Sequence, residues 1–151
     1  MPKKIFTILF IIFLSGCGYQ SIYENRNQQN ISIDKIILSG DASINRRILN
    51  LAGLKQDDES GPHSYNLKLT NTKLIKVTAK DSLGNASIFK MTININFSLI
   101  HNNKKKKQRV FTSSFVYNNS KDKFELTQYE KTLENNLINE LVEEIIIFIN
   151  L

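Results

Sequence analysis

Five cations gather in one short segment of the sequence, where they could bind an anion. They are Lys104, Lys105, Lys106, Lys107 and Arg109. Charge-assisted hydrogen bonds from ammonium or guanidinium groups to phosphate are among the stronger ones in proteins. At the tip of a hairpin, these side chains would be candidates for holding the phosphates of a ligand. The alternative is a solvated turn whose lysines keep a strand edge from aggregating.

A second basic pair, Lys121 and Lys123, falls in the loop before the last expected helix. This pair is a further candidate for contact with phosphate. The alternative is an exposed pair without a ligand, because lysines are seldom buried and most of them simply face water.

Residue patterns for catalysis are hard to find. The two histidines, His63 and His101, are expected at the surface in or beside loops, and neither belongs to a metal-ligand spacing. No glycine-rich phosphate loop occurs. The acid pairs Asp57-Asp58 and Glu143-Glu144 are interpreted as solvated faces. We therefore expect no enzyme, no metal and no cofactor; an enzyme would need an acid–histidine or metal cluster.

The single cysteine, Cys17, follows a segment typical of a secretory signal peptide. Lys3 and Lys4 supply a positive start, and the run from Ile5 to Leu14 is almost wholly apolar. This run is too short to cross a bilayer, which takes about 20 residues. The one thiol has no second cysteine to pair with, so a disulfide framework is excluded and the stability of the domain must come from its core.

The signal segment ends in Leu14-Ser15-Gly16-Cys17, which matches the bacterial lipobox of leucine, two small residues and cysteine. Cleavage there would leave Cys17 first, with diacylglycerol on its sulfur and an acyl chain on its amine; two or more chains anchor a protein firmly. The alternative is an ordinary signal peptide that happens to contain a cysteine. The sequence thus predicts a signal peptide at residues 1–16, a lipidated N-terminus and tether at 17–30, and one domain at 31–151.

The charge balance concerns partners and solubility rather than fold. The formal net charge is +6, of which Lys3 and Lys4 of the signal peptide contribute +2. The mature protein is therefore moderately basic. In the periplasm its anionic partners would be phospholipid, lipopolysaccharide and other envelope polymers, and we expect no nucleic acid.

The hydrophobic pattern predicts six elements. Residues 86–100 alternate most regularly, with apolar side chains on every second position, and predict a strand with one buried face. Along the preceding strand, Asn71 and Lys73 interrupt the apolar face, so a bend or a sheet edge is expected there. The first strand changes its apolar phase, which indicates a bulge or burial on both faces. The expected ranges are strand Ile31 to Leu38, helix from Asp41 to Gly53, strand Tyr65 to Ala79, strand 86–100, turn Asn102 to Lys107, strand through Phe111 to Tyr117, and helix Phe124 to Ile149.

These elements predict an α+β fold of order β-α-β-β-β-α. Both helices have an apolar stripe to bury, and the sheet has an apolar face to cover, so two helices should pack on one face of a four-stranded mixed sheet. The apolar stretch Ile145 to Leu151 exceeds what one stripe requires. It is the best candidate for a lipid-binding groove or for packing on the wall of a partner, although core residues are the usual explanation.

Several short motifs, taken in their order, resemble the lipopolysaccharide-assembly lipoprotein family LptE. The likeness covers nearly the whole chain. It is carried by the lipobox, Cys17-Gly18-Tyr19 with Ile22-Tyr23, the turn Ser82-Leu83-Gly84-Asn85-Ala86, Phe115-Val116-Tyr117-Asn118-Asn119 and a Glu-rich last helix.

The resemblance implies a partner and a task. Proteins of this family sit inside the outer-membrane β-barrel LptD, help it to fold, plug it, and take part in delivering lipopolysaccharide to the outer leaflet. The expected location is the periplasmic face of the outer membrane, and Gly18 after the cysteine agrees with sorting there. The alternative is an auxiliary lipoprotein of another envelope transport or barrel-assembly complex.

Overall fold

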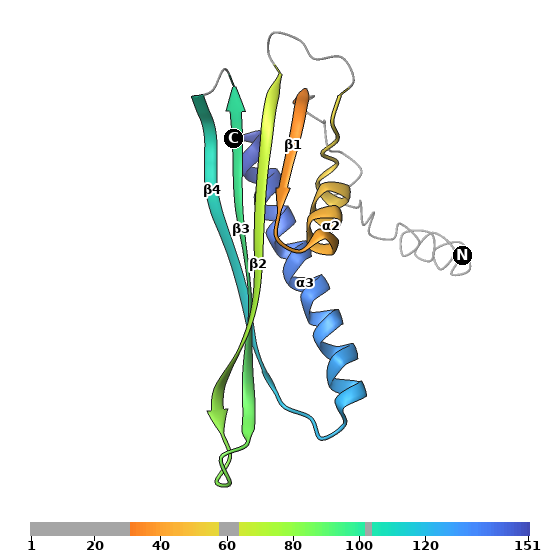
Figure 1. The fold of residues 1–151 in the computed structure, drawn as a ribbon, viewed down its shortest axis with the longest axis vertical. Helices are drawn as coiled ribbons and strands as arrows, with labels where there is room; N and C mark the ends of the chain where they lie inside the picture. Colours follow the sequence, from red (N-terminus) through yellow and green to blue (C-terminus); the bar gives the residue numbers. More distant parts are fainter. Residues whose placement is uncertain (1–30, 58–63, 102–103) are drawn as a thin grey trace, which may run out of the picture.

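Four strands form one mixed sheet, and two helices cover one of its faces (Figure 1). The computed structural model describes residues 31–57, 64–101 and 104–151. The strand order is β1-β2-β3-β4, with β1 parallel to β2 and the other neighbours antiparallel. This confirms the predicted fold class. The elements are β1 (Ile33–Ser39), α2 (Ala42–Ala52), β2 (Tyr65–Lys80), β3 (Ala86–His101), β4 (Lys104–Asn118) and α3 (Lys123–Asn150).

Helix α2 begins and ends where the sequence predicted. Asp41 is the N-cap, and its Oδ1 accepts hydrogen bonds from the backbone N–H groups of Ser43 (2.8 Å) and Ile44 (3.1 Å). These bonds satisfy donors that the first turn of a helix cannot pair internally, and they hold the pKa of the Asp41 carboxyl below its ordinary value. Gly53 ends the helix with φ of 66°, a left-handed conformation that glycine adopts without a steric penalty.

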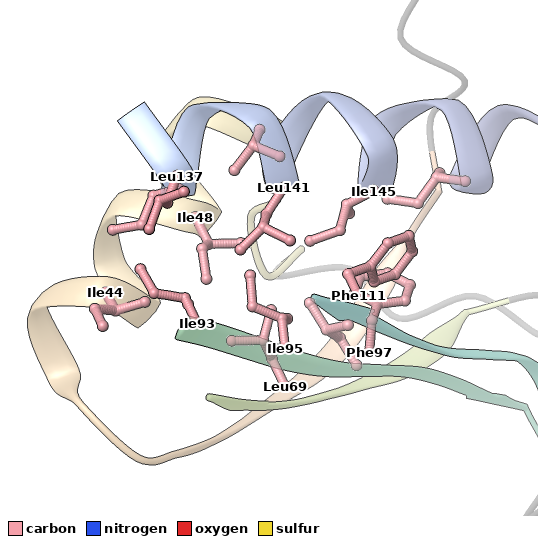
Figure 2. Close-up of a cluster of buried hydrophobic side chains, with 14 of the residues drawn as sticks. Ile44, Ile48, Leu69, Ile93, Ile95, Phe97, Phe111, Leu137, Leu141 and Ile145 are labelled. Carbon is pink, nitrogen blue, oxygen red and sulfur yellow. The ribbon is translucent and has the colours of Figure 1, made fainter. Parts of the chain in front are cut away.

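The core lies between the sheet and the two helices (Figure 2). Odd-numbered side chains of β2, β3 and β4 face the helices, as the alternation predicted. They meet one side of α2 and the last half of α3, where the buried positions recur at steps of three and four. The side chains labelled in Figure 2 are Ile44, Ile48, Leu69, Ile93, Ile95, Phe97, Phe111, Leu137, Leu141 and Ile145.

Strand β1 pairs with only the first part of β2. Its register shifts between Ile33 and Lys35, which confirms the expected bulge, and its last pair is Ser39 with Thr70. From Asn71 onward β2 is therefore an edge strand on that side, as the polar interruption predicted.

Asn71 joins this new edge to the start of α2. Its Nδ2 donates to the carbonyl of Asp41 (2.9 Å) and to Oδ1 of Asn45 (2.8 Å), and its Oδ1 accepts from the N–H of Asp41 (3.1 Å). Gly40, with φ of 93°, passes so close that a Cβ there would collide with the backbone carbonyl of Asn71. The tight turn between β1 and α2 therefore depends on a glycine and on a buried amide.

The sheet is long, and its two ends differ (Figure 1). We call one end the entry end: here β1, β2 and β4 begin, β3 and α3 finish, and the chain reaches the domain from residue 31. The opposite end is the hairpin end, with the β2–β3 turn at 81–85 and the β4–α3 linker at 119–122. Neither helix in the described part of the chain combines the length and the apolar character needed to cross a bilayer.

Candidate functional site

The lysine run belongs to strand β4 and not to the turn before it. The sequence predicted a turn through Lys107, but β4 begins at Lys104, which pairs with His101. Lys105 pairs with Ile100 and Lys107 with Leu99, so Lys106 is an extra residue at a β-bulge. The long alkyl stem of a lysine allows its ammonium group to reach water from a strand. A strand that starts with lysines can therefore form its backbone hydrogen bonds while its charges stay hydrated.

Lys107 differs from the other lysines of the run because its ammonium group meets the end of α3. Its Nζ donates to the backbone carbonyl of Ile149 (2.8 Å) and lies 3.4 Å from that of Phe148. The last carbonyls of a helix lack partners within the helix and carry the negative end of its dipole. Lys107 therefore caps α3 and holds its last turn against β4.

Arg109 also has a structural contact. Its guanidinium lies over the rings of Phe111 (5.2 Å to the centroid) and Phe148 (5.9 Å), and the Phe148 ring packs edge-on against Phe111 and Phe97. A guanidinium over aromatic faces is held by their quadrupoles as well as by packing. Of the five cations expected to act together, Lys107 and Arg109 thus stabilise the join between α3 and the sheet.

The remaining three, Lys104, Lys105 and Lys106, are exposed at the entry end, and we call them the lysine triplet. Within residues 31–57, 64–101 and 104–151, no carboxylate forms a salt bridge with the triplet. An ion pair elsewhere in the domain joins Lys73 and Glu134 at 2.6 Å. The triplet is thus an uncompensated patch of three ammonium groups.

Lys121 and Lys123 lie at the hairpin end, and the structure does not bring them together with the triplet. Strand β4, with 15 residues, separates the two groups by roughly 45 Å at about 3.4 Å per residue. Lys123 is the first residue of α3, and its Nζ contacts Oδ1 of Asn119 and the carbonyl of Ser120, both at 3.1 Å. Lys121 is exposed in the linker. A single small anion cannot touch both groups.

Two hydrogen-bonded polar pairs connect β4 to α3. The Tyr117 hydroxyl donates to Oε1 of Glu130 (2.6 Å), and the Ser113 hydroxyl donates to Oε2 of Glu140 (2.7 Å). Burial, with the hydrogen bond to the Glu130 carboxylate second, raises the pKa of Tyr117 far above its ordinary value. The phenol therefore stays a hydrogen-bond donor that ties β4 to α3.

The one histidine that the structure describes supports the strand end. His101 is half-buried, its Nδ1 lies 2.8 Å from the carbonyl of Ser64, and its ring packs against Tyr65 with centroids 5.4 Å apart. No group of three or more histidine, cysteine, aspartate or glutamate side chains in the described residues could hold a metal ion. His63 and Cys17 lie outside the described residues.

The apolar end of α3 is mostly core, and the sequence did not separate its inner from its outer side chains. Ile145 and Ile149 are buried and Phe148 is half-buried, whereas Ile147 is 61% and Leu151 is 88% exposed. Two exposed apolar side chains therefore stand at the entry end, on the part of the molecule that carries the lysine triplet.

Sequence reasoning missed a hollow at the hairpin end. It lies between the first turns of α3 and the strand end, and Asn118, Leu126 and Tyr129 line part of it. Figure 1 shows α3 leaning away from the sheet toward this end. These side chains are ordinary in type, and only the divergence of two elements makes the hollow, so no local motif could have revealed it.

Solved structures of bacterial lipoproteins share this fold. The rare lipoprotein B of Shewanella oneidensis has 13% identity and a TM-score of 0.55, with 74% of this chain and 89% of that chain covered. An uncharacterized lipoprotein B of Nitrosomonas europaea has 7% identity and a TM-score of 0.58, covering 77% and 81%. A minor lipoprotein of Acinetobacter baumannii has 15% identity and a TM-score of 0.54, covering 77% and 90%. No protein-family model and no curated protein sequence matches the chain. At these identities the likeness establishes a common fold.

Proposed function

We propose that this chain is a lipid-anchored lipoprotein on the periplasmic face of the outer membrane, where it partners the β-barrel LptD as plug and assembly factor in delivering lipopolysaccharide. One observation carries the proposal: a lipobox ending in Cys17 precedes a domain whose fold is shared with bacterial lipoproteins. The sequence resemblance to the LptE family supplies the partner and the task.

The uncovered face of the sheet supports a plug. Its even-numbered side chains are largely polar, and three of them form a ladder across neighbouring strands. Oγ1 of Thr112 donates to Oδ1 of Asn94 (2.8 Å), and Nδ2 of Asn94 lies 3.4 Å from Oγ1 of Thr72. The lumen of an outer-membrane barrel is polar and water-lined. A sheet face of hydroxyl and amide groups can hydrogen-bond to such a wall, directly or through water.

Lipopolysaccharide would be contacted through basic residues in this proposal. The phosphates of lipopolysaccharide bind best to cationic groups that make no contact within the protein. The lysine triplet and Lys121 are therefore better candidates than the residues with internal contacts, which are Lys107, Arg109 and Lys123. Reversing the triplet to glutamate should weaken lipopolysaccharide binding by at least tenfold without changing the melting temperature by more than a few degrees. The matched control reverses Lys76, Lys80 and Lys90, three lysines exposed elsewhere, and changes the net charge equally. Equal losses in both variants would mean that only net charge matters.

Anchoring is tested by fractionating cells that carry Cys17→Ala. We expect this variant in the soluble periplasmic fraction, whereas Ser15→Ala, which keeps a small residue in the lipobox, should stay with the outer membrane. If Cys17→Ala still fractionates with the outer membrane, either the lipid is dispensable or the barrel alone retains the protein.

The partner is tested by affinity purification of the tagged full chain from outer membrane, with identification of what copurifies. LptD in stoichiometric amount is the expected result. Recovery of the components of a different transport or assembly machine would favour the alternative of an auxiliary lipoprotein.

A further inference from the structure

Charge and apolar exposure coincide at the entry end of the domain. The lysine triplet extends there from β4, and the last turn of α3 beside it exposes Ile147 (61%) and Leu151 (88%). The cap that Lys107 forms on α3 fixes the two elements to each other, so these groups keep a constant arrangement. Exposed lysines next to exposed aliphatic side chains are the combination that proteins use at the lipid–water interface.

The same end is where the chain arrives from its proposed anchor. The described domain starts at residue 31, and β1 begins two residues later at Ile33, at the entry end (Figure 1). Thirteen residues lie between Cys17 and Ile31, a span of about 50 Å at most when fully extended. A lipid on Cys17 therefore draws the entry end toward the bilayer first, because the hairpin end lies a further strand length away.

Other charges near this end leave it positive. Asp34 and Lys35 follow the start of β1, and Lys55 and Asp57 lie beside it, since the N–H of Asp57 donates to the carbonyl of Ile33 (2.8 Å). Oδ2 of Asp57 in turn accepts from the N–H of Ile33 (3.2 Å), so that carboxylate is already engaged. Among the side chains that the structure describes at this end, these two acids and two lysines balance one another, and the triplet adds three positive charges.

We propose that the entry end docks on the anionic phospholipid headgroups of the membrane that holds the anchor. The ammonium groups of the triplet contact the phosphates, and Ile147 and Leu151 enter the interface. The proposal rests on the lipid anchor of the proposed function and concerns the anchored protein before it engages a barrel. Each lysine near an anionic surface favours the docked state roughly fivefold, so three together favour it by about a hundredfold. Anchoring supplies the high local concentration that makes such a weak contact effective.

The absence of tryptophan from the chain provides a clean test. The full lipidated protein is prepared with Ile147→Trp, and a matched protein with Phe124→Trp, which places the reporter at an exposed apolar position (73%) on the opposite end of α3. Both are reconstituted into vesicles of phosphatidylethanolamine with phosphatidylglycerol or with phosphatidylcholine, each carrying brominated acyl chains. Tryptophan fluorescence reports depth, because bromine quenches only nearby indoles.

We expect Ile147→Trp to be blue-shifted and quenched in the phosphatidylglycerol vesicles, and much less in the phosphatidylcholine vesicles. Phe124→Trp should be unquenched in both. Adding Lys104→Glu, Lys105→Glu and Lys106→Glu should abolish the quenching of Ile147→Trp. The matched reversal of Lys76, Lys80 and Lys90 should leave it intact.

Three results would overturn the docking inference: an unquenched Ile147→Trp, quenching that the triplet reversal does not change, or quenching that requires added lipopolysaccharide. Flotation with phosphatidylcholine vesicles tests the anchor separately. Protein that floats but keeps Ile147→Trp unquenched in the phosphatidylglycerol vesicles refutes the docked orientation alone. Protein that does not float lacks the lipid, and then the proposed anchor and the docking inference fail together.

Discussion

Replacing Lys107 by methionine should lower the free energy of unfolding by about 2 kcal/mol, whereas Lys105→Met should change it by less than about 0.5 kcal/mol. The two residues are both lysines of one strand, two positions apart. Lys107 donates to the final carbonyls of α3 and lies 5.9 Å from the centre of the Phe148 ring. A partly buried cation at a helix C-terminus stabilises by up to about 2 kcal/mol, and an exposed lysine by almost nothing.

Urea unfolding followed by circular dichroism measures the difference. For a domain of this size about 2 kcal/mol corresponds to a fall in melting temperature of roughly 8 °C, well outside experimental error. The denaturant m-value should stay constant, because neither change alters how much surface unfolding exposes. Equal stabilities for the two variants would refute the idea that Lys107 caps α3. Lys107 would then be a solvated lysine like those of the triplet.

This result also decides how ligand-binding variants are designed. Reversing the whole run from Lys104 to Lys107 would place a carboxylate against the helix carbonyls and weaken the fold. Any loss of lipopolysaccharide or lipid binding could then come from unfolding. Variants limited to the lysine triplet avoid this ambiguity.

Two further predictions concern the positions that hold the helices to the sheet. Gly40→Ala should destabilise the domain by at least about 3 kcal/mol, because the alanine would adopt a left-handed conformation and its Cβ would collide with the carbonyl of Asn71. Gly84 has a similar φ of 85° but no atom near the position of a Cβ, so Gly84→Ala should cost only about 1 kcal/mol. Thermal unfolding measures both losses. Comparable losses would contradict the close approach. Because the folded-state pKa of Tyr117 is raised, its contribution is complete below the ordinary tyrosine pKa of 10 and is lost as pH rises beyond it. Tyr117→Phe should therefore flatten the fall of melting temperature above pH 10, and identical curves would show that Glu130 and burial do not perturb the phenol.

The elements themselves were predictable because their periods are local. Met91 to Leu99 alternate without interruption, and every odd position among them is buried in the structure. Asp41 and Gly53 bound α2 through contacts with residues no more than four positions away. Such contacts depend on neighbours that the sequence itself places together, so capping and alternation can be inferred without knowledge of the fold.

The division of the basic residues was not predictable, because it depends on contacts between distant parts of the chain. Lys107 is an odd-numbered residue of β4, like the buried Phe111. From the local sequence, however, a lysine within a run of lysines is predicted to be exposed to solvent. Its partner carbonyls lie 41 and 42 residues further along the chain. Only the packing of α3 across β4 determines which of the five cations meets a helix end and which remain free to bind a ligand.

The polar interruption of β2 shows how a conflict in a local pattern can be informative. Asn71 and Lys73 have the parity of core residues, and each serves a different junction: Asn71 binds the start of α2, and Lys73 pairs with Glu134 of α3. The interruption marks the point where β1 ends and where helix cover gives way to solvent, since Leu74, Ile75 and Val77 beyond it are 39–46% exposed. A buried amide with all its bonds made costs little, whereas an unpaired one would be expensive. The sheet therefore extends past its own core toward the hairpin end, and the part of β2 beyond Asn71 exposes apolar side chains that no helix covers.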